Sequence, residues 1–168
     1  MLQQPGTSPL RASQVLAASL MSALVVIGVA LSSVFAGRHH QGSIPIWPFL
    51  VLVAEAAVAA VAIQLIGYRV PPLPSGLAAD EARSRGLLAF QQSMILRFAL
   101  AESVALVAIV LSFAVRAATV TPYLLGAAIS LVLMGLHVWP SERVIARVQE
   151  NLDRDGGRSE LATALRGG

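Results

Sequence analysis

The amino-acid sequence predicts an all-α membrane protein: a four-transmembrane-helix antiparallel bundle followed by a C-terminal amphipathic helix. Composition is the first observation. Of the 168 residues, 56% are hydrophobic and only 12% are charged, whereas soluble domains carry about 25% charged residues. The other two observations are four long apolar runs and an uneven distribution of arginine between the segments that join them. This composition excludes an ordinary soluble domain and a disordered chain.

Each apolar run has the length that a membrane-spanning helix needs. A bilayer core of about 30 Å is crossed by about 20 helical residues. None of the runs shows the alternation of apolar and polar residues that is typical of outer-membrane barrel strands. The predicted spans are residues 14–36, 48–68, 94–115 and 121–139.

The N-terminal segment has two interpretations. Residues 1–13 are polar and predict a loosely ordered cytoplasmic tail. Arg11 precedes the first apolar run, and the run ends in Val34-Phe35-Ala36, which looks like the cleavage site of a signal peptide. The run is longer than the usual apolar core of about 7–15 residues in such peptides, so a retained first span is favoured.

The arginines indicate the orientation in the membrane, because cytoplasmic loops are enriched in basic residues. All 12 basic residues are arginine, a usage typical of a GC-rich bacterial genome. With both termini inside, the inner segments hold Arg11, Arg69, Arg83, Arg85, Arg143, Arg147, Arg154, Arg158 and Arg166. The outer loops then hold only Arg38 and Arg116. The sequence therefore predicts a multi-pass protein of a bacterial plasma membrane with both termini in the cytoplasm.

The predicted cytoplasmic loop, residues 69–93, begins with prolines that end the second helix, Pro71, Pro72 and Pro74. A helical pattern returns from Gly76 onward, so the third helix is expected to extend out of the membrane on the inner side.

Residues 141–168 predict a cytoplasmic amphipathic helix and tail. Ser141 is a candidate N-cap for a helix over 142–152, whose apolar stripe is Val144, Ile145, Val148 and Leu152. Glu150 is spaced to pair with Arg154. Arg143, Arg147 and Arg154 lie on the other faces and are candidates for contact with anionic lipid or a partner. The alternatives are a solvated tail helix or a helix docked on the inner loop.

Two carboxyl groups, those of Glu55 and Glu102, lie inside predicted spans. A charge at the bilayer centre costs at least about 2.5–3.5 kcal/mol, so both are candidates for binding a proton or cation. Helix rise places them about 8 Å apart in depth. Glu102 is the stronger candidate because it lies deeper, among small residues that permit close helix contact. The alternative is a protonated carboxyl that hydrogen-bonds a neighbouring helix.

The remaining polar residues of the spans have structural interpretations. Arg97 is expected to extend to the inner headgroups, and Gln64 to lie at the surface or to hydrogen-bond between helices. His137 beside Trp139 is typical of an interfacial anchor. His39-His40 lacks nearby residues that would complete a metal site. The motifs of enzymes, nucleotide-binding loops and nucleic-acid modules are missing from the sequence, so we expect a non-enzymatic protein without cofactors, metals or nucleic acid.

Residues 97–106, RFALAESVAL, resemble the ion-carrying outer helix of the proteolipid (c-type) subunits of rotary ATPases. That helix places a glutamate in an Ala/Leu-rich run. The alanine-rich residues 54–62 are similar to the family's small-residue inner helix, and the connecting loop is cytoplasmic in both. The resemblance implies that Glu102 is the proton- or cation-binding carboxylate of a ring-forming protein. The loop 69–93 is longer than the family's polar loop, and four-span members carry the glutamate on an even-numbered span.

The leading hypothesis is a non-enzymatic integral membrane subunit that associates, through alanine-rich helix faces, with itself or with a larger membrane complex. The alternative is a small proton- or cation-coupled carrier or channel. In that alternative Glu102 binds the ion and Glu55 lies at its outer access.

Overall fold

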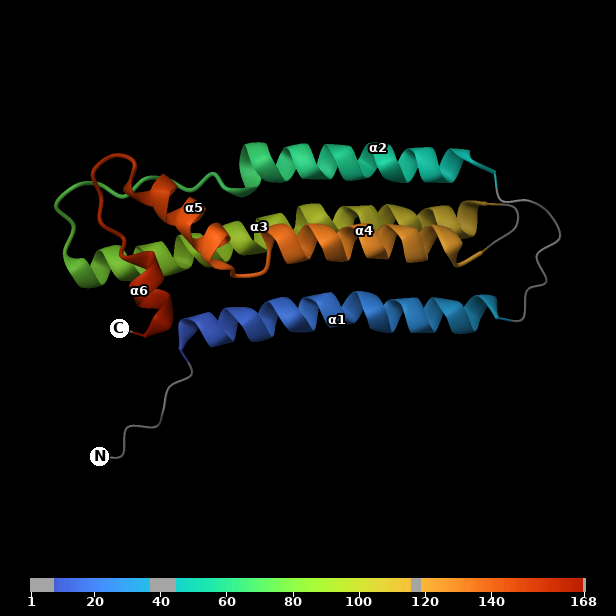
Figure 1. Ribbon diagram of the computed structural model, residues 1–168, viewed down its shortest axis with the longest axis horizontal. Helices are drawn as coiled ribbons and strands as arrows, with labels where there is room; N and C mark the ends of the chain where they lie inside the picture. The colour runs from blue at the N-terminus through green and yellow to red at the C-terminus, as the bar shows by residue number, and fades with distance from the viewer. Residues whose placement is uncertain (1–7, 37–44, 116–118, 168) are drawn as a thin grey trace, which may run out of the picture.

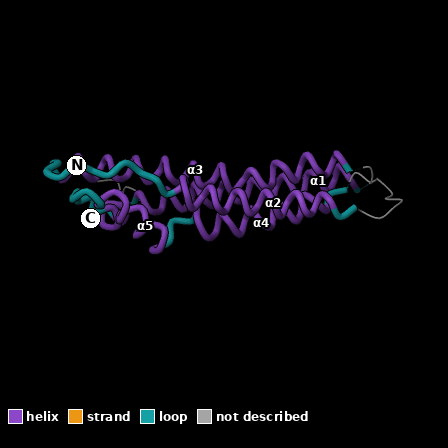
Figure 2. The backbone as a smooth tube through the Cα atoms, turned by 90° about the horizontal axis from the view of Figure 1, so that it is seen from above, coloured by secondary structure: helices purple, strands orange, loops and turns teal. Residues whose placement is uncertain are grey.

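The computed structural model describes residues 8–36, 45–115 and 119–167, and all regular structure in these residues is helical. Four long helices lie along the longest axis of the molecule, and two short ones lie at one end (Figures 1 and 2). The helices are α1 (Pro9–Phe35), α2 (Trp47–Ala62), the π-helix η1 (Ile63–Gly67), α3 (Ala79–Ala114), α4 (Thr121–His137), α5 (Glu142–Asp153) and α6 (Leu161–Arg166).

The helix starts follow from local sequence. The Ser8 side chain accepts a hydrogen bond from the backbone N–H of Arg11, and Pro9 follows in the first turn, where its missing N–H costs nothing. Residues 9–13, expected in the tail, are therefore helical, and that part of the prediction is wrong. Ser141 caps α5 as predicted, because its Oγ accepts from the backbone N–H of Val144.

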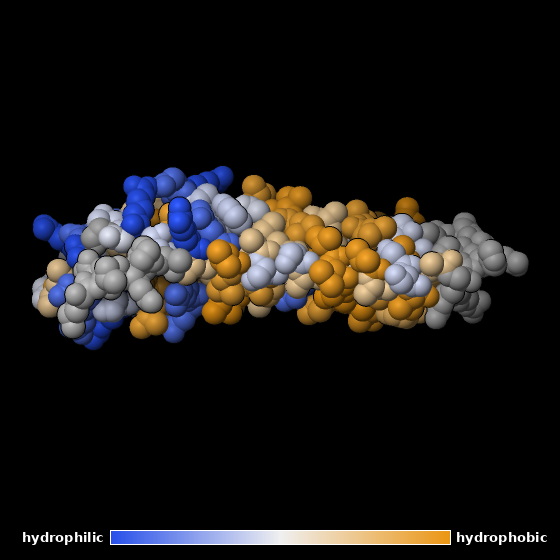
Figure 3. All heavy atoms as spheres, turned by 90° about the horizontal axis from the view of Figure 1, so that it is seen from below, coloured by the Kyte–Doolittle hydropathy of each residue, from blue (hydrophilic) through white to orange (hydrophobic). Residues whose placement is uncertain are grey.

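Three helical segments are long and apolar enough to cross a membrane: Pro9–Phe35, Trp47–Gly67 and Ala79–Ala114. The fourth, α4, meets the same test only together with α5, from which it is bent by 60°. The prediction of membrane-spanning helices is thus confirmed for three or four segments. At 36 residues, α3 is about 54 Å long, which exceeds a bilayer core of about 30 Å. Its first turns form part of the hydrophilic end of the molecule (Figure 3).

The α3 and α4 helices form the central pair, flanked by α2 on one side and α1 on the other (Figure 1). Gly126 makes the central contact close, since a Cβ there would overlap the Ala108 Cβ and lie 3.1 Å from the Val104 carbonyl oxygen. On the α1 side, the Tyr123 hydroxyl donates to the Leu24 carbonyl over 2.6 Å. The two central helices therefore hold the flanking helices in place.

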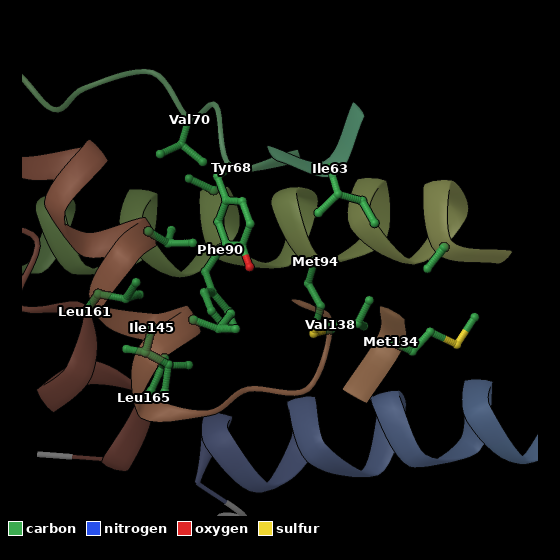
Figure 4. Packing of buried hydrophobic residues seen from close by; sticks show 14 of the residues in the cluster. Ile63, Tyr68, Val70, Phe90, Met94, Met134, Val138, Ile145, Leu161 and Leu165 are labelled. Carbon is green, nitrogen blue, oxygen red and sulfur yellow. The ribbon is translucent and has the colours of Figure 1, made fainter. Parts of the chain in front are cut away.

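The hydrophobic core of the long helices continues into the end of the molecule that carries α5 and α6 (Figure 4). We call residues 68–93 and 138–167 the polar end. The apolar stripe of α5, predicted as Val144, Ile145, Val148 and Leu152, is fully buried there. The backbone N–H of Leu73 donates to the Leu152 carbonyl over 2.8 Å, which fixes α5 against the loop after η1. Of the alternatives for this helix, docking on the inner loop is the one observed.

Two details of this end differ from expectation. Arg154 lies 3.8 Å from Asp155 rather than pairing with Glu150. Residues 161–166, expected as tail, form the short helix α6, whose Leu161 and Leu165 are buried in the core of the polar end. Burial of these two side chains supplies the stabilisation that so short a helix lacks by itself.

Candidate functional site

Glu55 lies half-buried on α2 and faces α3. Its Oε1 lies 2.9 Å from the Ser103 hydroxyl, whose single hydrogen is shared between this oxygen and the Leu100 carbonyl at the same distance. A carboxyl group held by a serine on the next helix is the hydrogen-bonded arrangement expected of an acidic residue in a span. The geometry therefore accommodates Glu55 as a helix–helix contact.

Glu102 lies half-buried on α3, directly before Ser103 in the sequence. No hydrogen bond or ion pair joins its carboxyl group to another of the described residues. It is close enough to Tyr123 of α4 for an electrostatic interaction. Of the two predicted carboxyl candidates, Glu102 is thus the one without a bonded partner in the described part of the chain.

The depth difference predicted for the two carboxyls is too large. The Glu55–Ser103 contact and a second one, in which the Ser93 hydroxyl donates to the Gly67 carbonyl, set the antiparallel register of α2 and α3. In this register Glu55 is level with the residue next to Glu102. The expected difference placed residue 48 at the outer edge and residue 94 at the inner edge of the bilayer core, without the register that packing of the two helices imposes.

Within the described residues, several polar side chains interact where the end of α2, α4 and α5 meet the middle of α3. The π-helical turn Ile63–Gly67 ends α2 here, and such turns are frequent at functional sites. A Cβ at position 67 would lie 2.7 Å from the Arg97 Cγ, so glycine is needed for the arginine to pass close to α2.

Arg97 is completely buried at this junction, with 0% of its surface exposed. Its Nε donates to the Ser93 carbonyl over 3.1 Å, and its Nη1 donates to the His137 carbonyl over 2.7 Å. His137 is the last residue of α4, so the guanidinium neutralises the negative end of that helix. The expectation that Arg97 extends to the headgroups is therefore wrong. Its Nη2 has no hydrogen-bond partner in the residues described.

Tyr68 lies beneath two guanidinium groups. The Cζ atoms of Arg97 and Arg147 lie 4.5 and 4.2 Å from the centroid of its ring, which are cation–π distances. Its hydroxyl and the Nδ1 of His137 are 3.0 Å apart. His137, expected as an interfacial anchor, is thus bonded within the protein. Figure 4 shows the tyrosine pointing from the chain after η1 toward α3.

Arg147 and Asn151 tie α5 to this junction. The Nη1 of Arg147 donates to the Gln64 Oε1 over 2.6 Å, so Gln64 bonds between helices and is also exposed at the surface, and both interpretations given for it hold. The Nδ2 of Asn151 donates to the Tyr68 carbonyl over 3.2 Å. Neither Arg147 nor Arg97 forms an ion pair with a carboxylate of the described residues. Positive charge at the junction is therefore left without a bound acidic side chain.

A groove of about 810 Å³ opens beside the junction, between the end of α2, the following loop and one face of α5. We call it the arginine groove. The lining residues with ionisable or amide side chains are Gln64, Tyr68, Arg69, Arg147, Glu150, Asn151 and Arg154. Three arginines face one glutamate here, so the groove suits an anion.

The other sequence candidates are not part of this groove. Arg143 is exposed on α5 outside its walls, whereas Arg147 and Arg154 line it. His39-His40 lies outside the described residues. The described residues contain no cluster of three or more His, Cys, Asp or Glu side chains that would hold a metal ion.

Sequence reasoning missed Tyr68 and Arg69 because neither carries a motif. The signal present in the sequence is Gly67-Tyr68-Arg69, in which an aromatic residue and an arginine follow a glycine at the end of a span.

The helices define this chain as a multi-pass membrane protein. No family model, curated protein or solved structure matches it.

Proposed function

We propose that this chain is a non-enzymatic subunit of a bacterial plasma membrane that associates with a second copy of itself. Its four long helices span the bilayer as an antiparallel bundle with both termini in the cytoplasm. One end of the molecule is hydrophilic (Figure 3), and the arginines of α5, α6 and the first turns of α3 belong to that end, which supports a cytoplasmic position for it. A larger complex that includes this chain is the alternative setting.

The observation that carries the proposal is an apolar groove between α1 and α4. Its volume is about 630 Å³, and its floor is formed by small side chains that include Gly28, Ala127 and Ala128. Within the bilayer, helices associate through small residues that allow close approach, since burial from water is not available there. A groove of this kind accommodates side chains of another helix.

The α1 edge of the groove makes the surface complementary to itself. Val25 and Val29 line this edge, are 56% and 65% exposed, and form a ridge along it. A two-fold axis brings the same patch of both copies together, so the ridge of each copy can enter the groove of the other. The flanking helices are also the least covered ones. In an apolar stretch of 18 residues within α1, and in one within the segment Trp47–Gly67, 17% of the residues are buried. In the corresponding stretch of α3 the share is 39%.

Cysteine cross-linking tests the proposal cleanly, because the chain contains no cysteine. We expect Ser33→Cys, which lines the groove, to give a covalent dimer in native membranes under mild oxidation. Val34→Cys is the matched control, because this exposed position lies at almost the same depth on α1 but outside the groove. Native mass spectra of the uncross-linked protein supply the copy number.

Preferential dimer formation by Ser33→Cys, with a dimeric mass for the unmodified protein, would support the proposal. Equal cross-linking of Ser33→Cys and Val34→Cys would overturn it. A monomeric mass for the unmodified protein, together with no preferential cross-linking of Ser33→Cys, would do the same. A cross-link from Ser33→Cys to a different polypeptide would show that the partner at this groove is another subunit of a larger complex and not a second copy of this chain.

A second candidate function is a proton- or cation-coupled carrier. The observation that favours it is the Glu102 carboxyl, which has no bonded partner among the described residues and lies half-buried at the depth of Glu55. In liposomes with a pH-sensitive dye, Glu102→Gln should abolish proton flux under this alternative. Under the subunit proposal the same substitution leaves assembly unchanged, because glutamine has the shape of the neutral acid.

A further inference from the structure

We propose that the arginine groove binds the phosphate of an anionic phospholipid whose acyl chains extend along α2. This site goes beyond the proposed association, since a monomer can hold the lipid as well as a dimer. Lipid binding and dimer formation are also measured independently, so that either proposal can fail alone.

The charge of the groove supports an anionic ligand. Arg69, Arg147 and Arg154 line it, and Glu150 is the acidic residue on its wall. Arg154 also lies 3.8 Å from Asp155, and both of those side chains are largely exposed. Guanidinium groups hold phosphate through paired, charge-assisted hydrogen bonds, which neutral side chains do not provide.

Buried charge behind the groove adds to this preference. The Tyr68 ring, which lines the groove, also stacks against Arg97. The Arg97 guanidinium is fully buried, forms no ion pair with a described residue and leaves its Nη2 without a hydrogen bond. Its field is weakly screened because water does not surround it. An anion in the groove would be stabilised by this additional positive charge behind it.

The groove is also held in shape before any ligand enters. Gln64 accepts a hydrogen bond from Arg147, and the Asn151 amide bonds both the Tyr68 carbonyl and the Arg147 carbonyl. The Arg147 guanidinium is therefore held by the Gln64 amide and by the face of the Tyr68 ring. A preorganised site loses less side-chain freedom on binding.

An adjoining apolar strip on η1 and α2 favours a lipid over a soluble anion. Leu65 lines the groove and is 58% exposed, and Val61 and Val58 follow on the same side of the helix, 56% and 63% exposed. These residues belong to the segment that is apolar enough to cross the membrane. A ligand with a phosphate and acyl chains would satisfy both surfaces, as basic pockets at membrane borders do for anionic headgroups.

Native mass spectrometry of the full chain in mild detergent measures this binding directly. We expect phosphatidylglycerol to bind more tightly than phosphatidylcholine with the same acyl chains. Arg69→Gln, Arg147→Gln and Arg154→Gln should each lower the affinity for phosphatidylglycerol about fivefold, the factor expected for one basic residue near a membrane surface. Arg143→Gln is the matched control, because it removes the same charge from an exposed position of α5 outside the groove.

Three outcomes would overturn the proposal. An equal loss in Arg143→Gln would show a general effect of surface charge. Equal binding of the two lipids would show that net negative charge is not recognised. Displacement by millimolar inorganic phosphate would show a site for a soluble anion. If Arg147→Gln fails to fold, as circular dichroism would show, Arg69→Gln and Arg154→Gln decide the outcome, because neither side chain stacks on Tyr68.

Discussion

Replacing Gly126 by alanine should push the two central helices apart. A Cβ at this position would overlap the Cβ of Ala108 and would lie 3.1 Å from the carbonyl oxygen of Val104 and 3.5 Å from a methyl group of Leu52. The first two of these atoms belong to α3 and are a backbone oxygen and a short side chain, so neither can rotate away. The helices themselves must move.

The size of the effect follows from opposing contributions. Alanine gains up to about 1 kcal/mol over glycine in a helix, whereas inserting a methyl group into a close-packed contact costs about 1–3 kcal/mol. Gly135, on the same helix, is exposed, and a Cβ there would meet no atom within 4 Å. Because both positions receive the same propensity gain, the difference between the two variants isolates the packing cost. We expect Gly126→Ala to be about 1–3 kcal/mol less stable than Gly135→Ala.

Reversible unfolding in mixed detergent micelles, followed by circular dichroism, measures this difference. The two variants differ from the native chain by the same atoms, so changes in detergent binding cancel to first order. A Gly126→Ala protein as stable as Gly135→Ala would refute the close approach of α3 and α4 at Gly126.

Two further predictions concern the polar end. Tyr68→Phe should cost about 0.5–1.5 kcal/mol of stability because it removes the hydroxyl bonded to His137 and keeps the ring, whereas Tyr68→Ala should cost about 3–5 kcal/mol. Equal losses in the same unfolding experiment would show that the stacking of the two arginines contributes nothing. Gly157→Ala should loosen the contact with the loop, because a Cβ there would lie 2.6 Å from the Leu73 carbonyl oxygen. Faster tryptic cleavage after the exposed Arg158 would report this, and an unchanged rate would contradict it.

The parts of the fold that could be predicted depend on local sequence. The length of an apolar run sets the length of a span, and a serine before a helical pattern sets the start of α5 at Glu142. The extension of α3 beyond the membrane segment was also predictable. The last prolines before it are at 71–74, and Ala79–Ala114 contains none. These features need no knowledge of which helices are neighbours.

The candidate site depends on neighbours and was largely hidden. Arg97 is near the inner end of its span, and by distance alone it could have extended to the headgroups. Its actual partner is the carbonyl of His137, 40 residues later in the chain. A helix end supplies an uncapped carbonyl group and a partial negative charge, and its position beside Arg97 follows from the packing of α3 against α4. The register that brings Glu55 to Ser103 is likewise a property of the packed pair.

The amphipathic helix α5 shows why the sequence left lipid and protein open as partners of the same face. A stripe of valine, isoleucine and leucine is apolar whether it enters a bilayer or a protein core, so periodicity does not distinguish the two. The hydrogen bond between Leu73 and Leu152 and the burial of Val148 assign the stripe to the protein. Under the lipid proposal the ligand would contact the polar faces of this segment, where Arg147 and Arg154 line the groove and Arg143 does not. The three arginines predicted as equivalent are therefore expected to differ, and the comparison of Arg154→Gln with Arg143→Gln measures that difference.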